Sequence, residues 1–305
     1  MALLSRRPEW SWAVLLPFFP CLFYAQSPDL TPPPAYRTSS AEVRISFFAT
    51  DEVNRPVAIV DKNDFAVVDD ELIIREFSSL ARSRETALDL ILVVDASRSV
   101  APRFSAMMHR VLTLISSQAP GSDDHLSVIV FGATQPSLLC ADDCRTSAAE
   151  QRLLSLKPDG PTPLFDALAL AANFASTRPD TGARLVLLLF SDGDDTFSTT
   201  SNLTALDAVI ASGATLYTID LGTGNSLGSL TLLQMAEATG GRAFALPPAE
   251  IDLFAAVSED LRAAYVVTYQ LPNHVAGFHS LRILPKHNLN LRFHCRRGYV
   301  YEKPD

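Results

Sequence analysis

Residues 88–95, with the sequence LDLILVVD, form an apolar run that only Asp89 interrupts before Asp95 ends it. Such a run, bounded by polar residues, is typical of a strand buried on both faces, as in a parallel sheet covered by helices. Similar apolar runs occur further along the chain, at residues 126–131, 184–190 and 215–220. These four segments are predicted to be strands of one sheet.

Between these runs, apolar residues recur at helical spacing. The segments predicted as helices are residues 104–117, 148–156, 164–176, 203–211, 229–239 and 251–264, and a short strand is expected at 242–244. Strand and helix alternate along the chain, which is the pattern of a doubly wound, mostly parallel sheet flanked by helices. The predicted fold class is therefore α/β, with the α/β domain spanning residues 85–264.

Short segments of alternating polarity lie on both sides of this domain. Strands are expected at residues 43–49, 65–68 and 72–77 before it, and at 265–271, 279–284, 289–294 and 297–301 after it. They predict a small β module over residues 41–84 and a C-terminal β segment over residues 265–305. Our hypothesis is that the two pair in one β-sandwich, with the α/β domain inserted between them.

Residues 1–25 have the pattern of a secretory signal: Arg6 and Arg7, an apolar stretch, and a cleavage site near Ala25. The stretch is short and interrupted by Pro17 and Pro20, so we expect no membrane span in the mature chain; an uncleaved N-terminal anchor is the alternative. Residues 26–40 are predicted to be a Pro-rich extended linker. The expected location is outside the cytoplasm: secreted, periplasmic or on the cell surface.

Charge and cysteine content narrow the function classes. The 305 residues carry 25 Lys and Arg against 34 Asp and Glu, a net charge of −9, which loss of Arg6, Arg7 and Glu9 with the signal would make −10. No basic block is present, which argues against nucleic acid as a partner.

Cys140 and Cys144 are close enough in the sequence to form a disulfide; the alternative is that they remain two free thiols.

Oxygen-bearing side chains occur where predicted strands end. Asp95, Ser97 and Ser99 follow the first strand, Asp192 follows the strand at 184–190, and Thr162 lies in a loop between them. Ligands in open α/β sheets bind at the carboxyl ends of the strands, and oxygen ligands suit Mg²⁺ and Ca²⁺. Each residue alone also has a structural interpretation: Thr162 as a helix N-cap, Asp192 as a turn residue, and the two serines as caps.

Together these motifs, DASRS at 95–99, GPTPLFDAL around Thr162 and FSDGDD around Asp192, resemble the metal-ion-dependent adhesion site of the von Willebrand factor type A domain. The resemblance covers residues 88–264, although Pro161 stands where a glycine is often found. The flanking segments resemble those of secreted bacterial proteins related to this family. The resemblance implies that Asp95, Ser97, Ser99, Thr162 and Asp192 bind a divalent cation, with Mg²⁺ expected and Mn²⁺ or Ca²⁺ as alternatives.

A partner's Asp or Glu carboxylate would then complete the coordination of the ion, as the resemblance implies. We therefore expect a non-enzymatic adhesion or protein-interaction protein. One alternative is a structural or assembly component of the envelope with a vestigial metal site. Another is a metal-dependent hydrolase, but the sequence has no Gly-x-Ser-x-Gly or His-Glu-x-x-His motif and its histidines are scattered. Asp194 and Asp195 are expected to lie on a solvated rim.

Overall fold

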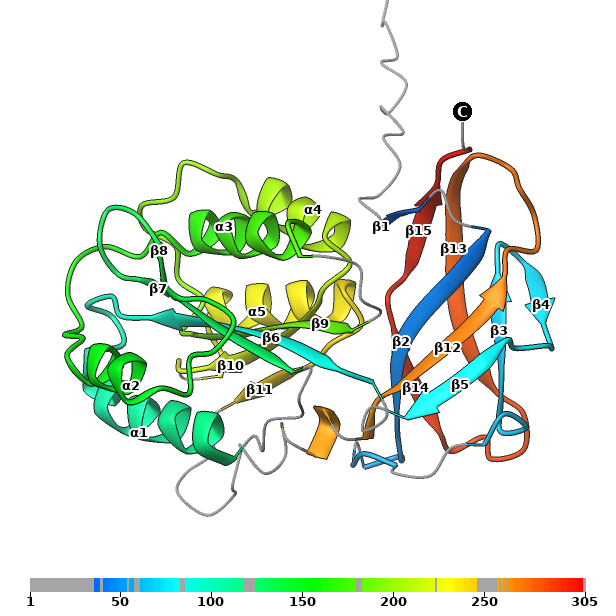
Figure 1. Cartoon of the computed structure of the whole chain (residues 1–305), viewed down its shortest axis with the longest axis horizontal. Coiled ribbons are helices and arrows are strands. Elements are labelled where there is room, and N and C mark those ends of the chain that lie inside the picture. The colour runs from blue at the N-terminus through cyan, green and yellow to red at the C-terminus, as the bar shows by residue number, and fades with distance from the viewer. Residues whose placement is uncertain are drawn as a thin grey trace, which may run out of the picture. The chain divides into compact units, whose positions relative to one another are not determined.

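The computed structural model of the chain describes residues 36–38, 41–53, 55–57, 61–82, 86–117, 124–178, 183–222, 224–245, 257, 259–261 and 263–303 (Figure 1). All of these belong to one compact unit. The predicted signal segment and most of the predicted linker lie outside the described residues. So does most of the helix expected at residues 251–264.

An α/β domain occupies the middle of the chain. Among the described residues its sheet has six strands in the order β11-β10-β9-β6-β7-β8. The strands are β6 (Leu88–Asp95), β7 (His125–Phe131), β8 (Ser137–Cys140), β9 (Arg184–Ser191), β10 (Thr215–Asp220) and β11 (Ala243–Ala245). All neighbours are parallel except β7 and the edge strand β8, which are antiparallel. The prediction of a doubly wound, mostly parallel sheet is confirmed.

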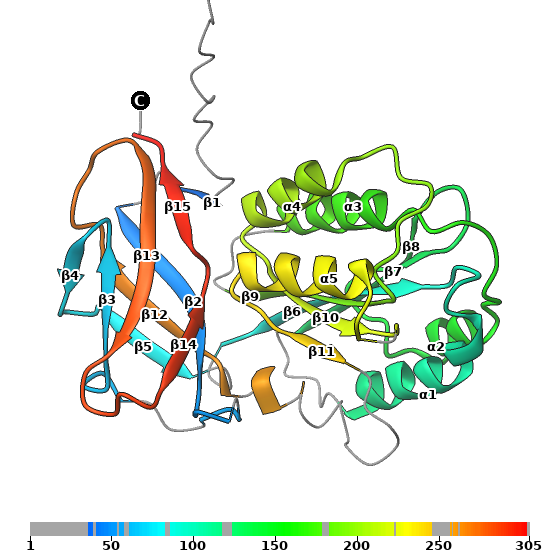
Figure 2. The ribbon, with the colours of Figure 1, turned by 180° about the vertical axis from the view of Figure 1, so that it is seen from behind.

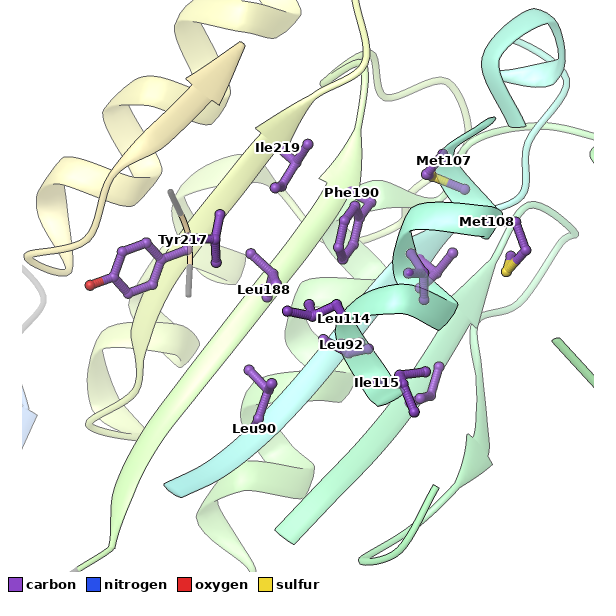
Figure 3. Packing of buried hydrophobic residues seen from close by; sticks show 14 of the residues in the cluster. Leu90, Leu92, Met107, Met108, Leu114, Ile115, Leu188, Phe190, Tyr217 and Ile219 are labelled. Carbon is purple, nitrogen blue, oxygen red and sulfur yellow. The ribbon is translucent and has the colours of Figure 1, made fainter. Parts of the chain in front are cut away.

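Helices cover both faces of this sheet (Figures 1 and 2). The helices are α1 (Ala101–Ser117), α2 (Ser147–Leu154), α3 (Leu164–Ser176), α4 (Asn202–Ala211) and α5 (Leu227–Ala238). Residues such as Leu90 and Leu92 pack with α1 and α2, whereas Ile91 and Val93 pack with α3, α4 and α5. Figure 3 shows Leu114 and Ile115 of α1 lying against strand residues such as Leu92. The alternation explains why both faces of β6 are apolar.

Among the described residues, nine further strands form two sheets that share a second apolar core. In the described part of the chain these are β1 (Tyr36–Thr38), β2 (Glu42–Thr50), β3 (Phe65–Asp69), β4 (Leu72–Ile74), β5 (Ser79–Arg82), β12 (Tyr265–Gln270), β13 (Gly277–Pro285), β14 (Arg292–Cys295) and β15 (Gly298–Tyr301). One sheet has the order β1-β15-β13-β3-β4 and the other β14-β2-β12-β5. Strands from before the α/β domain thus pair with strands from after it: β2 with β12, and β3 with β13.

The strands differ from the expectation at β1, at β4 and β5, and at β8, and β14 begins at Arg292 instead of residue 289. Residues 36–38, expected in the linker, form β1 and pair with β15, because this segment has no proline to remove backbone donors. The single strand expected at 72–77 is instead β4, which ends at Ile74, and β5 follows in the other sheet. Strand β8 was not predicted, because it is short and its side chains at Ser137 and Leu138 are exposed.

Cys140 and Cys144 form a disulfide that joins the end of β8 to the loop before α2, with the two Cα atoms 5.8 Å apart. Cys295, in β14, is a free thiol, and burial raises its pKa to about 11. None of the helices within the described residues has both the length and the apolar character needed to cross a membrane.

Candidate metal-binding site

The loop after β6 carries three of the five candidate residues. The side chains of Asp95 and Ser97 are buried, whereas Ser99 is exposed. The Ser97 backbone N–H donates to Asp95 Oδ1 over 2.8 Å, and the hydroxyls of Ser97 and Ser99 lie 3.1 Å apart. In the described residues neither hydroxyl bonds to the first turn of α1, so the capping interpretation of the two serines is wrong.

Asp192 follows β9, which lies beside β6 in the sheet, so both carboxylates reach the same edge. Ser191 links Asp95 to the loop that carries Asp192, because its hydroxyl donates to Asp95 Oδ2 over 2.7 Å and accepts from the Gly193 N–H over 3.1 Å. The pKa of Asp95 is raised to about 6, chiefly by burial and further by the charge of Asp192; hydrogen bonds from Ser97 and Ser191 oppose the shift.

The loop before α3 carries Thr162 and is bonded to both other loops. Asp159 N–H donates to the Ala96 carbonyl over 2.9 Å, and Arg98 N–H donates to the Gly160 carbonyl over 3.1 Å. Thr162 N–H donates to Thr196 Oγ1 over 2.9 Å, and Thr196 N–H donates to the Thr162 carbonyl over 3.0 Å. The structure therefore brings the three predicted segments together at the carboxyl edge of the sheet.

Thr162 does not have the N-cap role that its sequence position suggests. Helix α3 begins at Leu164, and the Leu164 N–H donates to Asp195 Oδ1 over 2.9 Å. Within the described residues the Thr162 hydroxyl makes no hydrogen bond, although the residue is buried. That hydroxyl is therefore available to a ligand.

Asp195 is half-buried and caps α3, which corrects the expectation that it lies on a solvated rim; Asp194 is exposed, as expected. Ser191 and Thr196 are further site residues that the sequence did not indicate. Both act through contacts with residues more than thirty positions away in the chain. The only local signal was that Ser191 directly precedes Asp192.

The donor set fits a hard divalent cation. Asp95 and Asp192 are both buried, and neither carboxylate forms an ion pair with a basic side chain in the described part of the chain. Burying two ionised carboxylates destabilises the folded protein unless a positive charge offsets them. No cluster of three His, Cys, Asp or Glu side chains suited to a metal occurs among the described residues, so any ion here depends on the three hydroxyls.

Residues 90–194 match the family model described as von Willebrand factor type A domain, and this range includes all five candidate residues. The chain contains a von Willebrand factor type A domain. The match confirms the resemblance to this domain family, and we call the α/β domain the A domain from here on. No curated protein matches the chain.

Several solved structures are similar to this chain. An aerotolerance-related membrane protein from Bacteroides fragilis is 16% identical, with a TM-score of 0.47, over 57% of this chain and 98% of that one. Manganese-loaded TRAP protein from Plasmodium vivax is 17% identical, with a TM-score of 0.45, over 79% and 100%. A von Willebrand factor type A protein from Catenulispora acidiphila is 14% identical, with a TM-score of 0.47, over 88% and 76%.

Proposed function

We propose that this chain is a secreted or envelope-associated, non-enzymatic binding protein. Its A domain binds a divalent cation through Asp95, Ser97, Ser99, Thr162 and Asp192. Through that cation it binds an Asp or Glu carboxylate of a protein partner. The family match supports a protein-interaction role.

One observation carries the proposal: two buried carboxylates that form no ion pair with a basic side chain among the described residues lie at the same sheet edge as the Thr162 hydroxyl, which bonds to no described residue. Asp95 and Asp192 supply the negative charge that would offset a divalent cation. Ser97, Ser99 and Thr162 supply neutral oxygens. This arrangement has no purpose in packing the core, because apolar side chains would fill the same space at a lower cost in desolvation.

The bound cation would act as a Lewis acid for oxygen ligands. Five protein groups do not all need to contact a Mg²⁺ ion directly, since this ion keeps waters and one of them can be exchanged for a partner's oxygen. Asp95 and Asp192 would balance the charge of the ion without filling its coordination shell, so a partner's carboxylate can take an exchangeable water position. The hydrogen bonds between the three loops hold the donors in place before the ion binds, which lowers the ordering cost.

Two features support a location outside the cytoplasm and a binding rather than catalytic role. The Cys140–Cys144 disulfide fits an oxidising compartment. None of the six histidines lies in the three loops of the site. His109 is in α1 and His125 begins β7, whereas His274, His279, His287 and His294 lie in the β-sandwich, in or between strands β12 to β14. Cleavage of residues 1–25 near Ala25 belongs to the same proposal.

Calorimetric titration of the full chain with Mg²⁺, Mn²⁺ and Ca²⁺ tests the function. We expect saturable binding that Asp95→Ala and Asp192→Ala each abolish. Asp207→Asn is the matched control, because Asp207 lies on α4 and contributes no oxygen to the site; this variant should bind as the unmutated protein does. Absence of binding to the unmutated chain, or equal binding by all variants, would overturn the proposal.

A further inference from the structure

Large apolar side chains are exposed beside the candidate metal site. Leu227 is 83% exposed, Leu203 71%, Leu230 53% and Phe197 48%. Phe197 lies in the loop after β9, and Leu203 and Leu227 lie in the first turns of α4 and α5. In a parallel α/β sheet, the helix after each strand begins at the carboxyl edge of the sheet. All these side chains therefore start from the edge that holds Asp95, Thr162 and Asp192.

Close backbone contacts place two of them directly at the site. A Cβ atom on Gly228 would lie 2.5 Å from the Asp192 carbonyl oxygen, so the first turn of α5 abuts the Asp192 loop. Leu227 immediately precedes Gly228. Phe197 immediately follows Thr196, which is bonded to Thr162. Each apolar side chain is thus one residue away from a residue that contacts a candidate metal ligand.

The outward face of α5 has an unusual composition for a surface helix. Leu227, Leu230 and Leu233 are exposed at a spacing of three residues, whereas Leu232 and Met235 pack into the core. Outer helix faces normally carry charged and polar residues. Along α5 the first charged residue is Glu237, in the last turn. Exposed apolar groups gathered next to a binding site mark a contact surface for a partner.

The charges around the site restrict the partner further. Asp194 is exposed next to Asp192, and Asp166 lies in the first turn of α3. Arg98 is paired with Asp159, its guanidinium Nη2 lying 2.7 Å from the Asp159 carboxylate. Arg103 is a basic side chain at this edge, and its guanidinium donates to the Leu221 carbonyl after β10. With Asp194 and Asp166, acidic groups still outnumber it when a cation offsets Asp95 and Asp192. A partner carboxylate can bind the ion, but additional acidic groups beside it would be repelled.

We propose, resting on the function above, that the partner is a protein segment with one Asp or Glu next to a large apolar side chain such as Leu or Phe, and with Lys or Arg rather than further acids nearby. The carboxylate binds the cation, and the apolar side chain packs on Leu227 and Leu230. This surface supplies specificity, because a metal ion alone binds any accessible carboxylate. A buried apolar contact next to a charged contact is a common arrangement at interface hot spots.

Selection of displayed random peptides on the full chain tests this assignment. Selection is done in Mg²⁺ and, separately, with a chelator. We expect that peptides enriched only in Mg²⁺ carry a single acidic residue next to Leu, Ile, Phe or Met. An enriched peptide should then bind the double variant Leu227→Ser, Leu230→Ser about 10-fold more weakly. Leu289→Ser is the control, since Leu289 is 76% exposed but lies in the β-sandwich, between β13 and β14, and it should leave binding unchanged.

Calorimetric titration with Mg²⁺ tests cation binding separately from peptide binding to the apolar surface. The double variant should bind the cation as the unmutated chain does, because both leucines are exposed and neither is a ligand. Two results would contradict the role of the apolar surface without contradicting the metal site: enriched peptides with no apolar residue next to the acidic one, or peptides that bind the double variant as well as the unmutated chain. If the unmutated chain binds no cation, the proposed function fails. Peptides enriched equally with the chelator would overturn the combined site.

Discussion

His279 Nδ1 lies 3.0 Å from Asp69 Oδ1, and both side chains are buried in the core of the β-sandwich. The other ring nitrogen, Nε2, lies 2.9 Å from the Val275 carbonyl oxygen. Both ring nitrogens thus lie within hydrogen-bond distance of oxygen atoms. Asp69 Oδ2 also accepts from the hydroxyls of Tyr269 and Tyr299 over 2.6 and 2.7 Å. This network joins both sheets and both flanking segments.

Removing the carboxylate from this network should destabilise the protein strongly. Asp69→Ala removes the shared partner of the buried side chains of His279, Tyr269 and Tyr299. A buried polar group left unpaired costs about 1 to 3 kcal/mol, so the free energy of unfolding should fall by about 3 kcal/mol or more. Urea denaturation measures the change. Asp70→Asn is the control, because Asp70 is exposed and its φ of 46° is one that Asn tolerates. We expect the control to change stability by about 0.5 kcal/mol or less; equal effects in both variants would contradict the account.

His294 should make the fold sensitive to mild acid. Its pKa is lowered to about 4, first by burial and then by the charges of Arg242 and Arg292, and its ring stacks on Phe48 at 4.5 Å. The unfolded chain takes up this proton near the ordinary histidine pKa of about 6.5. Its contribution to stability is therefore present above that pH and is lost as the pH falls toward about 4.

Thermal unfolding of His294→Gln across this pH range measures the effect. The variant should lose less stability on acidification than the unmutated chain. The quantity compared is the difference in stability between the variant and the unmutated chain at each pH, because Asp260 also titrates in this range. Burial raises the pKa of Asp260 to about 6, so its contribution to stability grows as the pH falls, opposite to that of His294. His109→Gln, on the exposed side of α1, should behave as the unmutated chain does. Parallel curves for His294→Gln and His109→Gln would show that this assignment is wrong.

Gly193 should be required for the shape of the candidate metal site. Its φ is +80°, and a Cβ atom there would lie 2.3 Å from the Gly228 carbonyl oxygen. Gly224 has a φ of +81° but open space around it. Gly224→Ala therefore costs only the left-handed backbone strain, about 1 to 2 kcal/mol. Gly193→Ala must also displace α5 from the Asp192 loop.

We expect Gly193→Ala to lower both the melting temperature and cation affinity more than Gly224→Ala does. Differential scanning calorimetry and cation titration measure the two quantities on the same samples. If the two variants were indistinguishable, the contact between the Asp192 loop and α5 would have no role in the site.

Substitutions at Thr162 should change cation affinity without a large change in stability. Its hydroxyl bonds to no described residue, so Thr162→Ala should change the free energy of unfolding by about 1 kcal/mol or less. Cation affinity should fall by about 10-fold or more, because a ligand oxygen is lost. Thr162→Ser keeps the oxygen and should restore most of the affinity. Loss of stability without loss of affinity would contradict the assignment.

The sequence predicted the parts of the fold that depend on continuous patterns. The apolar run of β6 and the helical spacing of α3 are strong local signals, and both elements occur where expected. The candidate ligands could be placed because each directly follows or precedes such an element. Asp195 and Ser191 could not be placed, since their roles arise from contacts with Leu164 and Asp95 across the fold. The short edge strands β1 and β8 carry too few residues for a periodic signal.

The most direct measurement is the crystal structure of the full chain soaked in Mn²⁺, with anomalous diffraction to locate the ion. The account predicts one strong anomalous peak at the carboxyl edge of the A-domain sheet, coordinated by oxygens from the loops of Asp95, Thr162 and Asp192. Asp95→Ala crystals treated in the same way should lack the peak. A peak elsewhere, or none at saturating Mn²⁺, would contradict the proposed metal site.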